Sequence, residues 1–341
     1  MVLRSEQGCW MFDCGEGTQT QLMKSSVRPG RLNKIFITHL HGDHLFGLPG
    51  LLCTISQCAN DSSSPSTINI YGPHGLRKFL RTAMHLSRSL LGFQYSVHEL
   101  LADVHPAAFD GLEGWNPDYA ASEPLHPQEV LGTDIKPNAQ GFWDVCQEGS
   151  FRVHAGMLTH RIVCFGYVVV EDSLPGRLCV EKLKALGVPP GPLYARLKKG
   201  ESITTPGGVT VDPADVVSPS RPGRKIVVLG DTCESGHIVP LAMNADVVVH
   251  ESTNQNCDGQ KCRDNGHSTP AMAAEFCKLV SAGKLILTHF SQRYRNSGAV
   301  LDADEKSVDI LVEEARLALG STNVEAAEDL KTFTVSAQKS T

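Results

Sequence analysis

Three histidines and one aspartate lie within six consecutive residues, His39-Leu40-His41-Gly42-Asp43-His44. They follow the apolar run at residues 35–38, which predicts a short buried strand. A loop at the end of such a strand can direct alternate side chains to one point, and His nitrogen with Asp oxygen is a ligand set that suits Zn²⁺. We therefore interpret the segment as part of a metal site; the competing interpretation is a histidine-rich surface loop.

Other apolar runs deliver polar residues of the same kind. Asp231 follows the predicted strand at 225–230, His250 and Glu251 follow 246–249, and His289 follows 284–288. His160 precedes a further run at 162–167. In layered α/β folds, functional residues gather at the ends of central strands, so we expect these side chains to converge with the first motif. Taken singly, each of these residues is better explained as a strand-ending turn residue or a helix cap.

Composition sets limits on the class of protein. The 341 residues are 41% hydrophobic and 20% charged, which is typical of a globular chain with one large domain or two modest ones. We expect neither a signal peptide nor a membrane span, and a cytoplasmic location with the nucleus as a second compartment. Eleven cysteines, an odd number, predict reduced thiols. A net charge of −6 argues against general nucleic-acid coating but allows a local basic patch.

Basic charge is concentrated at residues 176–200. Six Lys and Arg side chains oppose one acidic side chain there: Arg177, Lys182, Lys184, Arg196, Lys198 and Lys199 against Glu181. Frequent Pro and Gly between residues 175 and 208 favour an extended arm over a long helix, with a solvated linker as the alternative. Such an arm could reach a phosphate backbone. A second proline-rich insertion, at 102–148, is expected to be surface loop.

Several phrases in combination resemble ribonuclease Z, the short form of the tRNA 3′-processing endonuclease, in the metallo-β-lactamase superfamily. They are Phe12-Asp13-Cys14-Gly15-Glu16-Gly17-Thr18-Gln19, His44-x-x-Gly47-Leu48-Pro49-Gly50, His250-Glu251-Ser252-Thr253, Gly266-His267-Ser268-Thr269 and Thr288-His289-Phe290-Ser291-x-Arg293-Tyr294. The resemblance implies an α/β fold of four layers, αββα, with two mixed sheets face to face and a protruding basic arm. It implies a nuclease domain at 1–320 that contains the arm at 171–223, and a C-terminal tail at 321–341.

The resemblance also implies two Zn²⁺ per chain. The matching positions are His39, His41 and His160 for one ion, Asp43, His44 and His289 for the other, and Asp231 as the bridge. Asp43 matches the general base, with a purely structural ligand as the alternative. His267 is expected to donate a proton to the departing 3′-oxygen, and Glu251 to orient it. Residues 266–270 also predict the N-cap of a helix at 271–280, and His250, Ser252 and Thr253 are expected to support the ligands.

The implied activity is zinc-dependent endoribonucleolytic removal of 3′ trailers from precursor tRNA, in which water attacks the phosphodiester and a tRNA 3′-hydroxyl remains. The resemblance further implies that the arm grips the tRNA elbow and that the chain forms a homodimer. Two alternatives stay open: a broader zinc phosphodiesterase that acts on small phosphate esters, and a truncated tRNA-binding protein without turnover. The second arises because the family has an extra strand and loop of about two dozen residues before the segment matching Val2-Leu3-Arg4. We expect their loss to affect stability or substrate positioning while all seven metal positions survive.

Overall fold

The computed structural model describes residues 1–58, 67–102, 118–120, 123–205 and 207–336, and these form two compact units. We call residues 1–169 and 225–333 the body. We call residues 170–224, with residues 334–336, the arm unit. Within the described residues, no helix is both long and apolar enough to span a bilayer. All eleven cysteines are free thiols, as predicted.

The first sheet of the body is mixed. Its order is β1 (Val2–Ser5), β2 (Gly8–Phe12), β3 (Leu32–Phe36), β4 (Thr67–Pro73), β5 (Gln94–Leu100) and β6 (Glu129–Val130), with β7 (Asp134–Ile135) also paired to β5. The β1/β2 pair is antiparallel, and β2 through β5 are parallel to one another. The helices that follow these strands are α1 (Thr18–Lys24), α2 (Gly42–Leu45), α3 (Leu48–Cys58) and α4 (Leu76–Leu86), with the 3₁₀ turn η1 (Pro29–Arg31).

The second sheet is also mixed. Its order is β18 (Val324–Ala326), β15 (Leu285–Thr288), β14 (Val247–Glu251), β13 (Lys225–Val228), β10 (Cys164–Glu171), β9 (Phe151–Leu158) and β8 (Trp143–Glu148). Strands β13, β14, β15 and β18 are parallel, whereas β8 and β9 are antiparallel. The remaining body elements are η2 (Gly236–Ile238), α8 (Val239–Ala242), η3 (Asn256–Asp258), α9 (Gly259–Asp264), α10 (Pro270–Leu279), α11 (Asp309–Leu319) and the short pair β16 (Tyr294–Arg295) and β17 (Lys306–Ser307).

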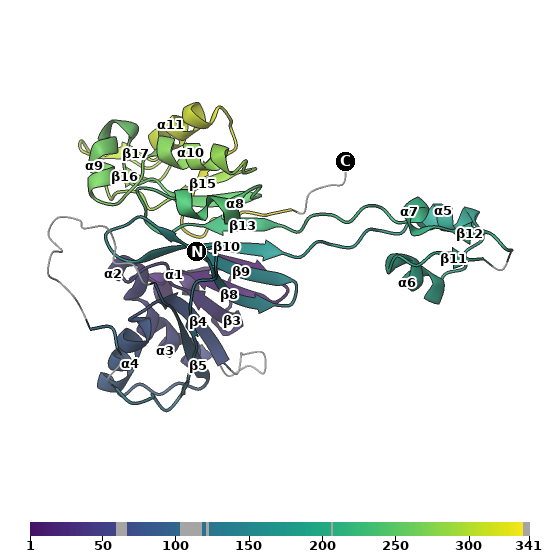
Figure 1. Cartoon of the computed structure of the whole chain (residues 1–341). Helices are drawn as coiled ribbons and strands as arrows, with labels where there is room; N and C mark the ends of the chain where they lie inside the picture. The colour runs from purple at the N-terminus through teal and green to yellow at the C-terminus, as the bar shows by residue number, and fades with distance from the viewer. Residues whose placement is uncertain (59–66, 103–117, 121–122, 206, 337–341) are drawn as a thin grey trace. The chain divides into compact units, whose positions relative to one another are not determined.

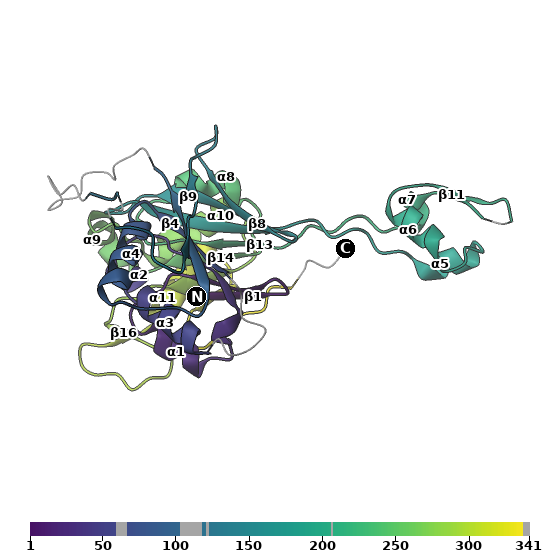
Figure 2. The ribbon, with the colours of Figure 1, turned by 90° about the horizontal axis from the view of Figure 1, so that it is seen from below.

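The two sheets lie face to face with helices outside, which gives the predicted four layers (Figure 1). Helices α3 and α4 cover the first sheet, α10 and α11 cover the second, and α1 packs beside α3 (Figure 2). Side chains alternate across a strand, so β3 serves two cores. Ile35 packs toward the helices with an aliphatic cluster, whereas the Phe36 ring lies 5.3 Å from the ring of Tyr167 on β10 of the other sheet. The α/β fold class is therefore confirmed.

The sequence misassigned two parts of the body. Residue 321 was too early a start for a C-terminal tail, because Val324–Ala326 forms strand β18 beside β15. Residues 102–148 are not all surface loop, because β6, β7 and β8 lie between residues 129 and 148. Residues 103–117 and 121–122 of that insertion lie outside the described part of the chain.

The arm unit contains a small core of its own. Its elements are α5 (Val180–Ala185), α6 (Pro192–Lys198), α7 (Pro213–Val216), β11 (Ile203–Thr204) and β12 (Thr210–Val211). The buried side chains are Leu183, Val188, Leu197, Ile203, Val211 and Val216. The alternative of a solvated linker was therefore wrong, and the arm is not merely an extended chain. Lys182 and Lys184 on α5 and Lys198 on α6 are exposed, as is Lys199.

Candidate metal centre

The first motif is held at the end of β3 by an acidic side chain from the neighbouring strand. Asp13 directly follows β2 and has a left-handed backbone, with φ at 58°. Its carboxylate accepts hydrogen bonds from the Thr38 backbone N–H at 2.7 Å and from the Thr38 hydroxyl at 2.9 Å. Nδ1 of His44 donates to the same carboxylate at 2.7 Å. Gly15 allows this close packing, because a Cβ there would overlap the carbonyl oxygen of Asp43.

One group of potential ligands consists of three histidines, His39, His41 and His160. Nε2 of His39 and Nε2 of His160 each lie 3.1 Å from Nδ1 of His41. Nδ1 of His160 donates to the Gly266 carbonyl at 2.7 Å, which leaves Nε2 with its lone pair. Burial lowers the pKa of His160 to about 4 and that of His39 well below its usual value. The group therefore presents uncharged imidazole nitrogens, the form that binds metal.

The second group consists of Asp43, His44, Asp231 and His289. Nε2 of His289 lies 3.2 Å from Oδ2 of Asp231 and 3.4 Å from Oδ2 of Asp43. Nε2 of His44 lies 3.5 Å from an oxygen of each carboxylate. Hydrogen bonds from His289 and His44 hold the pKa of Asp43 well below its usual range. Charge is therefore concentrated in this group, in contrast to the first.

Histidine protonation in the second group opposes the effect of burial. Burial alone would lower the pKa of His44, but hydrogen bonds to Asp13, Asp231 and Asp43 raise it to about 12. Burial would also lower the pKa of His289, but the charge of Asp231 and a hydrogen bond to Asp43 raise it to about 9. For Asp231, burial alone would raise the pKa, yet the charge of His289 and a hydrogen bond from His44 hold it low.

Asp231 joins the two groups. It follows β13, and its Oδ2 lies 3.7 Å from Nε2 of His39 in the first group. Nε2 of His44 is buried, and the nearest oxygens of Asp43 and Asp231 stay 3.5 Å from it, a separation that a metal ion between these three side chains would explain. All seven predicted ligand residues are thus brought together, and imidazole nitrogens with carboxylate oxygens suit a borderline metal such as zinc. The site could hold metal with no further protein donor.

His267 and Glu251, predicted as a catalytic pair, lie against the second group. Nδ1 of His267 donates to Oε1 of Glu251 at 3.0 Å. The same carboxylate accepts from the Thr232 backbone N–H at 2.9 Å and from the Thr253 hydroxyl at 2.7 Å. Glu251 is buried and its orientation is therefore fixed, whereas the His267 side chain is 22% exposed. Glu251 thus holds a partly accessible imidazole beside the ligand groups.

The sequence predicted a side-chain N-cap in the loop that carries His267, but the structure has none there. Helix α10 begins at Pro270, and Thr269 at its N-cap makes no side-chain capping bond. Instead, the hydroxyl of Ser268 donates to the carbonyl of Thr232 at 2.6 Å. The loop is therefore tied to the segment that carries Asp231.

Sequence reasoning gave Asp13 no role, although it contacts a ligand directly. The signal was present, because Asp13 is an acidic residue directly after a buried strand, as Asp231 is. Of the three residues expected to support the ligands, Thr253 does contact one, with its hydroxyl oxygen 3.1 Å from Nδ1 of His289. His250 instead bonds the carbonyl of Glu251 and packs beside Phe276.

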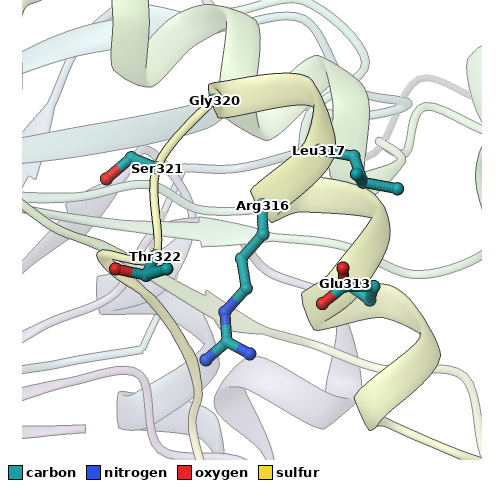
Figure 3. A pocket seen from close by; sticks show the side chains of 6 residues that line it. All are labelled: Glu313, Arg316, Leu317, Gly320, Ser321 and Thr322. Carbon is teal, nitrogen blue, oxygen red and sulfur yellow. The ribbon is translucent and has the colours of Figure 1, made fainter.

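A shallow depression lies elsewhere, at the C-terminal end of α11 (Figure 3). It is lined by Glu313, Arg316, Leu317, Gly320, Ser321 and Thr322. The guanidinium of Arg316 donates to the carbonyl of Val324 at 3.1 Å, so it ties the helix to β18. None of the six lining residues belongs to the ligand groups.

Comparison with known proteins places this geometry in a family. The model of the metallo-β-lactamase superfamily matches residues 1–54. Zinc phosphodiesterase ELAC protein 1 of Homo sapiens is 44% identical over 344 aligned residues, which cover 99% of this chain and 94% of that protein. Ribonuclease Z of Streptococcus pneumoniae is 39% identical over 285 residues, 84% of this chain and 80% of that protein.

Solved structures agree with the sequence relatives. The crystal structure of human tRNase Z, short form, superposes with a TM-score of 0.63 at 35% identity and covers 98% of this chain and 91% of its own. A metallo-β-lactamase fold protein of Bacillus subtilis shares the fold at 15% identity, with a TM-score of 0.52 and coverage of 96% and 88%. The chain therefore belongs to the family of zinc phosphodiesterase ELAC protein 1 and ribonuclease Z, within the metallo-β-lactamase superfamily.

Proposed function

We propose that this chain is a zinc-dependent endoribonuclease that removes 3′ trailers from precursor tRNA. The observation that carries the proposal is the convergence of two ligand groups on Asp231, in a chain whose relatives are named ribonuclease Z and zinc phosphodiesterase. Two zinc ions per chain, one in each group, would supply an activated water and charge stabilisation for the phosphate oxygens.

Asp43 is suited to handle the attacking water. Its side chain is 66% exposed, so it is accessible from solvent while Oδ2 contacts His44 and His289. Because its pKa is low, the carboxylate is ionised at neutral pH and can orient a water by accepting a hydrogen bond from it. As a general base it would take the proton of a water that a bound metal ion had already made more acidic. The alternative is that Asp43 serves as a ligand alone.

His267 is suited to protonate the departing 3′-oxygen. Glu251 engages Nδ1, so Nε2 is the ring atom available to a substrate. We expect His267→Ala to lower cleavage of precursor tRNA by about 10²–10⁴-fold, the usual range for a general acid. Cleavage of the p-nitrophenyl ester of thymidine 5′-monophosphate should slow only a few fold, because nitrophenolate departs without a proton. Equal losses on both substrates, with zinc content unchanged, would contradict the role in acid catalysis.

The exposed lysines of the arm unit are suited to contact tRNA phosphates. They lie on α5, on α6 and directly after α6, around a packed core, so their charge can be removed without removing buried side chains. We expect the variant with Lys182, Lys184, Lys198 and Lys199 all changed to Gln to bind precursor tRNA more weakly and with a shallower salt dependence. Glu181→Gln on the same α5 helix is the control and should not weaken binding. Small esters should be cleaved at the wild-type rate by both variants.

The decisive experiment is cleavage of a 3′-extended precursor tRNA by zinc-loaded protein, with Asp43→Ala and a chelated sample alongside. We expect a product with a mature 3′-hydroxyl that both controls abolish. If the protein holds two zinc ions and hydrolyses small esters but leaves precursor tRNA intact, the broader phosphodiesterase is the better assignment. If it binds tRNA and cleaves neither substrate, it is a binding protein. Homodimer formation and the cytoplasmic and nuclear location stay predictions, the first open to analytical ultracentrifugation.

A further inference from the structure

An exposed aromatic pair lies beside the metal centre and has no part in the chemistry described above. Phe46 comes two residues after His44, at the C-cap of α2, and 57% of it is exposed. Its ring stacks on Phe79 of α4, with centroids 6.0 Å apart and an interplanar angle of 13°. Phe36 and Phe12, by contrast, are almost fully buried between the sheets. One face of the Phe46 ring is therefore occupied by Phe79, while the rest of the ring remains open to solvent.

The Phe46 ring lies at the rim of the ligand groups. A Cβ on Gly42 would come within 2.5 Å of Cε2 of Phe46, so the ring rests against the Gly42 backbone. Gly42 separates His41, of the first group, from Asp43, of the second. A nucleoside on the phosphate at this centre is therefore within reach of the ring.

The ring and the proposed proton donor adjoin different parts of the centre. The side chains form a closed circuit: His41 to His160 at 5.0 Å, His160 to His267 at 5.2 Å and His267 to His289 at 5.3 Å between ring centroids, then His289 to Asp43 at 3.4 Å, with Gly42 between Asp43 and His41. In this circuit His267 lies between His160 and His289, whereas Gly42, with Phe46 against it, lies between His41 and Asp43. The 3′-oxygen of the mature tRNA belongs beside His267, and so does the nucleoside that carries it. The position in line with this departing oxygen belongs to the attacking water. The nucleoside joined through its 5′-oxygen is the other group on the phosphate, and it is the one left for the part of the centre next to Gly42 and Phe46.

We propose that Phe46, backed by Phe79, stacks on the nucleobase of the first trailer nucleotide. This inference rests on the proposed function, because the roles of tRNA and of His267 decide which nucleoside faces the ring. Every base presents a flat face to an aromatic ring, so stacking would hold trailers of any sequence. The contact would place the phosphate without adding a charge to the centre.

The test is a cycle of two changes, one in the protein and one in the RNA. Wild type and Phe46→Leu are each given precursor tRNA with a natural first trailer nucleotide or with an abasic one. We expect either change alone to lower kcat/KM by about 10-fold, within the range of one base stacked on an aromatic side chain. Both changes together should also give about 10-fold, because they remove the same contact. Phe46→Tyr keeps a ring and should retain most of the wild-type rate.

Controls separate stacking from damage to the centre. Zinc content and melting temperature should be unchanged in Phe46→Leu, and Leu86→Ala, which alters an exposed side chain at the end of α4, should cleave both RNAs as wild type does. A 100-fold loss in the combined case would overturn the inference, because the ring would then act independently of the base. The inference would also be overturned if Phe46→Leu cleaved natural precursor tRNA at the wild-type rate, or if its only defect were altered self-association of the protein. A wild-type protein that cleaves neither RNA refutes the proposed function itself, and is thereby distinguished from a failure confined to Phe46.

Discussion

The two ligand groups use similar side chains but differ in charge. In the first, burial keeps the pKa of His39 and His160 low, so the imidazoles are neutral before any metal arrives. In the second, carboxylates raise the pKa of His44 and His289, so protons occupy the nitrogens that a metal would use. The comparison teaches that ligand type does not fix the protonation state of a site. Burial keeps the imidazoles of the first group neutral, whereas in the second group the carboxylate partners outweigh burial.

The rings of His39, His160 and His44 each have a hydrogen-bond partner at Nδ1. Thr38 donates its hydroxyl proton to Asp13, so toward Nδ1 of His39, 3.0 Å away, it can only accept. His160 bonds a backbone carbonyl at the equivalent position. His44, in contrast, bonds the carboxylate of Asp13. A neutral acceptor fixes the tautomer of a ring, whereas an anion also stabilises its charged form.

The largest expected effect comes from removing the residue that both groups share. Asp231→Ala would remove a carboxylate that lies beside both His44 and His289, together with the link to His39. We expect cleavage to fall on the order of 10⁴-fold, because Asp231 would contact both ions of the proposed centre, and both ions would prepare the nucleophile. Zinc should fall below two ions per chain by elemental analysis. Asp304→Ala, which changes an exposed acid, is the control. Full zinc content in Asp231→Ala would show that the two groups are independent.

A smaller effect should separate the groups. Asp13→Asn keeps the size of the side chain but removes the charge behind His44. We expect zinc affinity to fall about 10–100-fold in one binding step only, the usual effect of losing such a partner. Competition with a chromogenic chelator would resolve the two steps. Asp13 also holds the Thr38 loop that leads to His39. Equal weakening of both steps would therefore mean that Asp13 supports both groups, which contradicts the expected effect on one step only.

The sequence predicted which side chains converge better than it predicted what holds them in place. His39 to His44, Asp231 and His289 all follow apolar strands, and parallel strands bring their ends to one edge of a sheet. The role of Asp13 depends on β2 pairing with β3, which no local pattern reveals. The arm core was missed because Leu183, Leu197 and Ile203 are scattered among Pro and Gly without helical or strand periodicity. Local patterns identify strand ends, whereas neighbours across a sheet require the fold.

The smallest effect, a count of protons, is the sharpest test of the comparison. At pH 7.5 the metal-free protein should carry protons on His44 and His289, whose pKa values are raised to about 12 and about 9, and none on His160, whose pKa is lowered to about 4. Zinc needs neutral imidazoles, so filling the second group should release about two protons and filling the first none. Above pH 9 the proton of His289 is already lost, and the second step should release about one. Zinc affinity of the second group should therefore rise with pH while that of the first stays level.

The same shifts predict opposite effects on the stability of metal-free protein. His289 has a folded pKa above its ordinary 6.5, so it contributes stability that is present below pH 6.5 and lost as the pH rises through about 9. His160 has a folded pKa below 6.5, so its contribution is present above pH 6.5 and lost as the pH falls toward 4.

Calorimetric zinc titrations in buffers of different ionisation enthalpy would count the protons released as zinc fills each group. Equal release in both steps would mean that the two groups hold the same charge, and the contrast between neutral and protonated ligands would fall with it.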